Sequence, residues 1–126
     1  MKSLLLACMM LVTCPAWAGW ELVSIDAGDD RYYMDPTTIR KNGNMRLVWE
    51  LANLAVRHKD GELSRRSRQE YDCIKERWRI ISFSTHSGPD ASGVVIMNST
   101  SNDTFPWTDV PPRTVVSAML KYVCDR

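Results

Sequence analysis

The first eighteen residues constrain the rest of the chain most, because they decide the compartment and therefore the redox state of its cysteines. Lys2 precedes an apolar run over residues 4–12, and Ala16-Trp17-Ala18 matches the A-x-A pattern of a signal-peptidase site. This order is typical of a secretory signal peptide, and the run is too short to span a bilayer as a helix. We therefore predict a signal peptide over residues 1–18 and one exported domain over residues 19–126, destined for the cell surface, the medium or the periplasm.

Cys14 offers an alternative way of processing the N-terminus. It follows Leu11, Val12 and Thr13 as in a bacterial lipobox, but Thr13 stands where Ala, Gly or Ser is usual. Because the A-x-A site lies just downstream, we expect cleavage after Ala18 rather than a lipid anchor at Cys14. No other apolar run approaches the length of a bilayer, so no transmembrane segment is predicted.

Cleavage after Ala18 leaves two cysteines, Cys73 and Cys124, in an oxidising compartment. They are too far apart for a C-x-x-C redox or zinc motif, and two cysteines allow a single intramolecular pairing. We therefore predict a structural disulfide between them. In the chain-entropy description, closing a loop of this length stabilises the fold by about 4 kcal/mol.

The exported part predicts a run of strands followed by one helix. Short strands are expected within residues 19–25 and 31–35, and a long strand over residues 45–56 between an Asn-Gly and an Asp-Gly turn. Residues 63–84 contain no turn signal and are too long for one flat strand, so we expect a bend or bulge near Cys73. Residues 94–97 are predicted to form a last short strand.

The C-terminal segment has the pattern of an amphipathic helix. It follows the Pro111-Pro112 pair, which can open a helix, and it ends at Cys124. Its apolar stripe consists of Val116, Met119, Leu120 and Val123. The predicted fold is therefore α+β, a single antiparallel sheet with a C-terminal helix tied to a central strand by the disulfide.

One helix can cover only one face of such a sheet. On the strand over residues 45–56 the odd positions are the more apolar, so we place them, and Trp49 with Trp78, in the core. The apolar residues of the other phase, Val48, Leu54 and Val56, then need a second cover. Dimer formation and a peptide or protein partner are the two candidates.

Charge and motif content exclude several classes of function. Without Lys2 the chain has fifteen basic and fifteen acidic side chains, so it is neutral overall, unlike a DNA-binding domain. The two histidines, His58 and His86, have no His or Cys partner at metal-ligand spacing, and no phosphate-binding glycine loop occurs. We predict no enzymatic activity, no cofactor, no metal and no nucleic-acid partner.

Basic residues gather around the Asp60-Gly61 turn. The set comprises Arg57, Lys59, Arg65, Arg66 and Arg68, with His58 among them. One interpretation is a solubilising edge, because charges on an edge strand oppose aggregation. The other is a docking surface for an anionic partner, such as an acidic protein segment, a sulfated polysaccharide or lipid head groups.

Eight short features follow one another along the exported part. They are Trp20, "YYMD", "TTIR", "VWELANLA", "YDC", "ERWR", "FPW" and "KYVC". This ordered set resembles the surface-adhesin protein E family of small secreted bacterial proteins. The resemblance implies a six-stranded antiparallel sheet, a helix fastened by the disulfide Cys73–Cys124, formation of a homodimer, and binding of host extracellular-matrix proteins.

The leading hypothesis is thus a secreted or surface-exposed bacterial binding protein that uses the basic hairpin. The alternative is a periplasmic protein of envelope structure or assembly without adhesin activity. A third interpretation is an inhibitor of a secreted enzyme, with the loop over residues 87–93 as its inserting segment.

Overall fold

The computed structural model describes residues 19–100 and 102–126. The predicted signal peptide and Cys14 lie outside the described residues. The strands are β1 (Glu21–Ile25), β2 (Arg31–Met34), β3 (Arg40–Asn42), β4 (Met45–Asn53), β5 (Ser64–Asp72), β6 (Arg77–His86), β7 (Val95–Asn98) and β8 (Thr108–Asp109). A 3-10 helix, η1 (Pro36–Thr38), precedes β3, and the helix α1 (Val115–Cys124) ends the chain.

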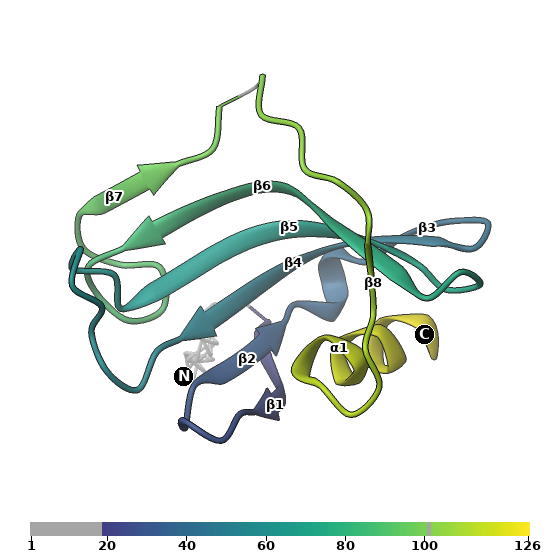
Figure 1. The fold of residues 1–126 in the computed structure, drawn as a ribbon, viewed down its shortest axis with the longest axis horizontal. Coiled ribbons are helices and arrows are strands. Elements are labelled where there is room, and N and C mark those ends of the chain that lie inside the picture. Colours follow the sequence, from purple (N-terminus) through teal and green to yellow (C-terminus); the bar gives the residue numbers. More distant parts are fainter. Residues whose placement is uncertain (1–18, 101) are drawn as a thin grey trace, which may run out of the picture.

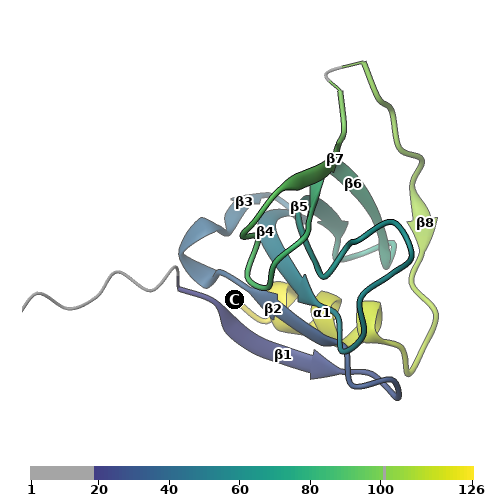
Figure 2. The same ribbon diagram turned by 90° about the vertical axis from the view of Figure 1, so that its left-hand side faces the viewer.

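Six strands form the body of one antiparallel sheet in the order β1-β2-β4-β5-β6-β7. The short strands β3 and β8 pair with β4 and β6. The sheet curls around α1. The strands β4, β5 and β6 lie on one side of the helix, and β1 and β2 lie on the other (Figures 1 and 2). The predicted α+β fold is confirmed, including the number of strands that the resemblance implied.

The core fills the space between the concave face of the sheet and α1. Met119 and Val123 of the helix pack against Met34, Val48 and Tyr71 of the sheet, and all five are at most 2% exposed. The disulfide Cys73–Cys124 fastens the end of the helix to the end of β5, as predicted.

The start of α1 is fixed by its own sequence. Thr114 accepts a hydrogen bond from the Ser117 N–H, and the Ser117 hydroxyl accepts one from the Thr114 N–H, which together form a capping box. Within residues 19–100 and 102–126, no helix is long and apolar enough to cross a membrane.

The prediction of one strand over residues 63–84 with a bend or bulge near Cys73 is wrong, because the chain reverses completely after Asp72 and forms two strands. The Asp72 carboxylate accepts hydrogen bonds from the N–H groups of Ile74 and Lys75, and Glu76 adopts a positive φ of 50°. Such side-chain to backbone bonds make a turn without Gly or Pro, so the usual turn signals are missing. A bulge does exist, but it lies in the β5–β6 pairing, between Arg68 and Gln69.

The predicted core phase of β4 is wrong for the face that α1 covers, although Leu51 of the predicted phase is itself only 2% exposed. Val48, assigned to the uncovered phase, is 1% exposed and lies beneath α1. Trp49 lies on the opposite, outer face of the sheet, whereas Trp78 does pack against the core. Val56 is 76% exposed and lies beyond the end of β4. The three residues that suggested a dimer therefore do not form one apolar surface.

Candidate functional site

The predicted basic cluster is divided between the two faces of the sheet. Successive residues of a strand point to opposite faces, and opposed residues of paired strands share a face. Arg65 lies opposite Ala52, on the concave face. Arg66 lies opposite Leu51 and Arg68 opposite Trp49, both on the outer face.

Two of the predicted residues are engaged within the fold. Arg57 donates from Nη1 to the carbonyl oxygens of Gly61, at 2.9 Å, and Ser87. Arg65 forms an ion pair with Glu62 at 2.9 Å, and its guanidinium lies 5.9 Å from the centre of the Phe83 ring. These contacts hold the segment between β4 and β5 in place. Lys59 is exposed in the turn and makes no ion pair with any described residue.

Arg66 and Arg68 instead meet a third arginine on the outer face. Arg40 of β3 lies opposite Leu47 of β4, which places it on the same face as Trp49. The Arg66 guanidinium lies 4.2 Å from the centre of the Trp49 ring, a cation–π contact. We call Arg40, Trp49, Arg66 and Arg68 the outer arginine face.

Two hollows adjoin Trp49 on this face. One, of about 370 Å³, is lined by Thr37, Thr38, Arg40, Trp49 and Arg68. The other, of about 340 Å³, is lined by Trp20, Asp35, Thr38, Trp49, Arg66, Asp90 and Ala91. Both acids of the second hollow have other partners, since Asp35 accepts from Thr37 and Asp90 from Asn53.

None of the three arginines of this face forms an ion pair with a described carboxylate. The face is therefore positively charged and free to contact an anion. Sequence reasoning missed Arg40 because it lies far from the basic hairpin in the chain. Its only local signal is the "TTIR" segment before the Asn-Gly turn.

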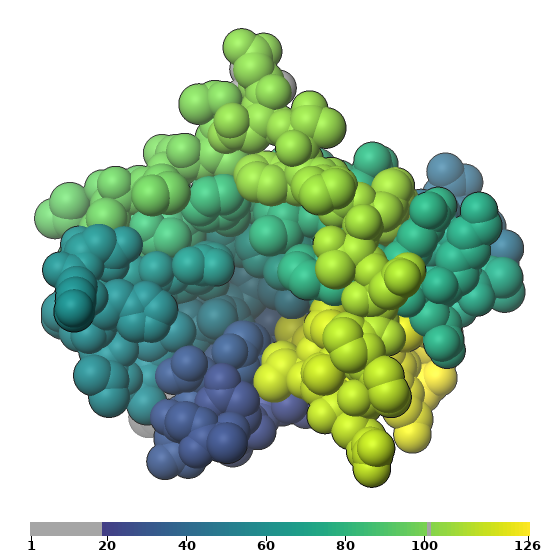
Figure 3. Space-filling view, viewed as in Figure 1, coloured from purple at the N-terminus to yellow at the C-terminus, as the bar shows by residue number. Residues whose placement is uncertain are grey.

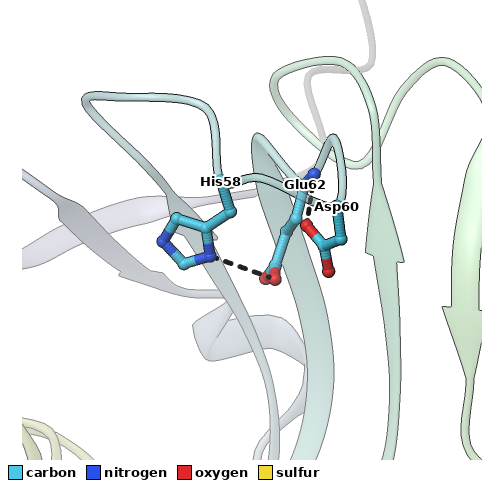
Figure 4. A group of neighbouring side chains, drawn as sticks. All are labelled: His58, Asp60 and Glu62. Atoms are coloured by element: carbon cyan, nitrogen blue, oxygen red, sulfur yellow. Dashed lines mark hydrogen bonds and ion pairs between the residues drawn. The ribbon is translucent and has the colours of Figure 1, made fainter.

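A second cluster, at the tip of the β4–β5 connection, has the composition of a metal site. His58, Asp60 and Glu62 each present a ligand atom, and these atoms lie within 4.8 Å of one another (Figure 4). However, both oxygens of Glu62 accept hydrogen bonds from Arg65, at 3.0 and 3.2 Å, and Asp60 accepts the Glu62 N–H. The arginine already neutralises the central carboxylate, so the cluster is better explained as an ion-pair network that orders the turn.

The concave face carries a recess that no sequence motif announced. It has a volume of about 310 Å³ and is visible between the strands and the helix in Figure 3. A smaller hollow of about 230 Å³ adjoins it under α1, and both are lined by Tyr32, Glu50, Gln69 and Trp78. Glu50 lies in the middle of β4, the strand with the clearest sequence pattern. The only sequence sign of this recess is that Glu50 is a single acid among apolar residues.

Glu50 is the chemically unusual group of this recess. It is 6% exposed, and its hydrogen-bond partner is the hydroxyl of Tyr71, which donates to Oε2. Burial raises the pKa of Glu50 to about 8, against a lowering effect of the Tyr71 bond. Burial beside this carboxyl also holds the pKa of Tyr71 well above its ordinary value.

Comparison with known proteins agrees with the fold. The profile of the family described as surface-adhesin protein E matches residues 20–125. No curated protein sequence matches the chain.

Solved structures of protein E from Haemophilus influenzae share the architecture. A selenomethionine form is 12% identical, with a TM-score of 0.66, and the match covers 86% of this chain and 88% of that one. A second crystal form is 13% identical, with a TM-score of 0.64 and coverage of 86% and 89%. Protein E of a non-typeable strain is 11% identical, with a TM-score of 0.58 and coverage of 89% and 79%.

Identities this low show a common fold and leave the binding residues to be argued from this chain alone. The family profile, by contrast, spans nearly every described residue, from Trp20 to Asp125. By its profile match, and with the sheet, helix and disulfide that the resemblance implied, the chain belongs to the surface-adhesin protein E family.

Proposed function

We propose that this protein is an exported bacterial adhesin that binds host extracellular-matrix proteins through the outer arginine face. Membership of an adhesin family supports the class of function, and the related structures carry the name protein E. The observation that supports the site is the group of three arginines without acidic partners around Trp49. This proposal keeps Arg66 and Arg68 of the basic hairpin and adds Arg40.

The chemistry of this face suits an acidic segment of a protein partner. Arginine donates paired hydrogen bonds to carboxylates and sulfates, and its planar group stacks on aromatic rings. Arg66, already stacked on Trp49, is held in place before a ligand arrives, which reduces the entropy lost on binding. The hollows beside Trp49 give a partner side chain somewhere to enter.

A charge-matched mutant pair tests the proposal. The variant Arg40→Ser/Arg66→Ser/Arg68→Ser removes the face, and Lys41→Ser/Lys75→Ser/Lys121→Ser removes the same charge from exposed lysines elsewhere. Binding to a panel of immobilised matrix proteins, among them collagen and fibronectin, is measured between about 10 and 150 mM salt, where the screening length falls from about 30 to 8 Å. We expect the arginine variant alone to lose binding and its salt dependence. Equal loss in both variants would reject the site.

Surface exposure is a separate requirement of the adhesin proposal. Protease shaving of intact cells, followed by immunodetection of the protein, should remove it if it faces outward. Protection until the outer membrane is broken would support instead the periplasmic role in envelope structure or assembly.

We further propose that the protein forms a homodimer through the edge strand β7. This strand ends the sheet, and Val95 and Met97 are 48% and 52% exposed, next to Val94 at 71%. An apolar edge with unpaired backbone groups favours pairing with another strand. Another copy of this chain offers the same edge.

A further inference from the structure

The recess on the concave face lies on the opposite side of the sheet from the outer arginine face. From its shape and lining we propose that this recess binds a single alkylammonium group, such as a lysine side chain, with Glu50 as the counter-charge and the aromatic rings of Tyr32 and Trp78 as its walls. This inference stands independently of the adhesin proposal.

The first argument is that the buried carboxyl has no counter-charge. Glu50 is 6% exposed, and none of the described basic side chains forms an ion pair with it. Its Oε2 is bound by Tyr71, but Oε1 makes no hydrogen bond with a described residue. Ionising a buried acid that has no opposite charge beside it is expensive, so its place at a recess points to a cationic ligand.

The second argument is the lining around this carboxyl. Tyr32 and Trp78 supply aromatic surface, and Leu54 and Ile80 supply apolar surface for an alkyl chain. A cation next to aromatic faces gains cation–π stabilisation, and this gain grows when water is excluded. A volume of about 310 Å³ is at the lower end for ligand sites, which suits one side chain rather than a larger molecule.

The third argument is the charge balance of the recess. Its other charged or titratable lining groups are Asp30, Tyr32, His58, Glu62 and Arg65. The one arginine is neutralised by Glu62 at 2.9 Å, and α1 contributes only Val115, Val116 and Met119 to the adjoining hollow. Asp30 and Glu50 therefore leave the recess acidic whenever Glu50 is ionised.

Binding of the cation and ionisation of Glu50 are coupled. Because the pKa of Glu50 is about 8 in the empty protein, this group is mostly protonated at pH 7. An ammonium group then binds as the Glu50 proton leaves to solvent, and the charge of the pair is balanced. If only the ionised form binds, affinity should tighten about 50-fold between pH 6 and pH 8, while an alkylamine stays protonated as lysine does.

The test uses n-pentylamine, with n-pentanol as an uncharged probe of the same length. Titration calorimetry in buffers of different ionisation enthalpy should show release of nearly one proton per bound pentylamine at pH 7. Pentylamine should bind with the pH dependence given above, and pentanol at least 10-fold more weakly at pH 8. A peptide with one internal lysine, compared with its norleucine analogue, asks whether a chain-borne side chain reaches the same site.

Variants assign the effect to Glu50. In Glu50→Gln the pH dependence and proton release should disappear and affinity at pH 8 should fall at least 10-fold, whereas the control Glu70→Gln, on the outer face and paired with Arg79, should bind normally. The indole N–H resonance of Trp78, a buried group without an acceptor, reports occupancy of the recess in the unmodified protein. Equal binding of pentanol, absence of proton release, or an unmoved Trp78 resonance would each overturn the proposal, even if Glu50→Gln failed to fold.

Discussion

Breaking the disulfide Cys73–Cys124 should remove a large part of the stability of this fold. The two cysteines are 51 positions apart, so the chain-entropy relation gives about 4 kcal/mol for the constraint on the unfolded chain. A small domain has a net stability of about 5–15 kcal/mol, so the loss is a large share of the total. For a domain of this size it corresponds to a fall in Tm of roughly 15–30 °C.

The native contacts of the helix survive this change. Met119 and Val123 remain buried against Met34, Val48 and Tyr71, so the variant Cys73→Ala/Cys124→Ala should still fold at 25 °C. Urea denaturation followed by tryptophan fluorescence and by far-UV circular dichroism measures the loss. Unmodified protein in a reducing agent is the matched control. Reduction breaks the disulfide and adds only one hydrogen atom to each sulfur, so the side chains otherwise stay the same.

Two results would refute this reasoning. A loss below about 1 kcal/mol would mean that the unfolded chain is already compact enough for the crosslink to add little. Separate transitions by fluorescence and circular dichroism would mean that α1 detaches alone, so that the bond acts locally on the helix rather than on the whole unfolded chain.

Three further predictions concern other parts of the molecule. Because burial raises the pKa of Glu50 from 4.5 to about 8, the folded protein binds the extra proton, and the free energy of unfolding should fall as pH rises between these values, by up to about 5 kcal/mol. Denaturation series from pH 4 to pH 9 measure this, and Glu50→Gln should flatten the profile; a stability that rises through this range would contradict it. Thr114→Ala removes the cap of α1 and should lower the free energy of unfolding by about 1 kcal/mol. The comparison is Thr37→Ala, which removes an exposed hydroxyl whose hydrogen bond, to Asp35, lies outside α1. Met97→Lys should convert the proposed dimer to a monomer in light scattering after gel filtration, with Lys41→Ser as control, and an unchanged mass would reject β7 as the interface.

The local sequence pattern predicts only part of the outer arginine face. Arg66 and Arg68 are close together in the sequence, but Arg40 joins them only through the pairing of β3 with β4. Arg57 and Arg65 belong to the same basic segment, yet their guanidinium groups are occupied by Gly61, Ser87 and Glu62. A list of nearby charges cannot separate free arginines from engaged ones.

The sequence by itself determined the features that depend on the number of cysteines, on local periodicity and on turn residues. Cys73 and Cys124, the two cysteines beyond the predicted cleavage site, allow one pairing, the stripe containing Met119 and Val123 repeats with the period of a helix, and Asn-Gly marks the turn before β4. These signals need no knowledge of distant neighbours, because each follows from the geometry of one segment.

The tertiary structure decided which face of the sheet is the core. In β4 both phases carry apolar residues, so alternation alone cannot tell whether Val48 or Trp49 is covered, and the answer depends on where α1 docks. The same docking buries Glu50 beside Tyr71 and leaves the recess open next to it. Burial, and with it the pKa and the binding chemistry of a side chain, is a property of the neighbours that folding brings, which no single segment contains.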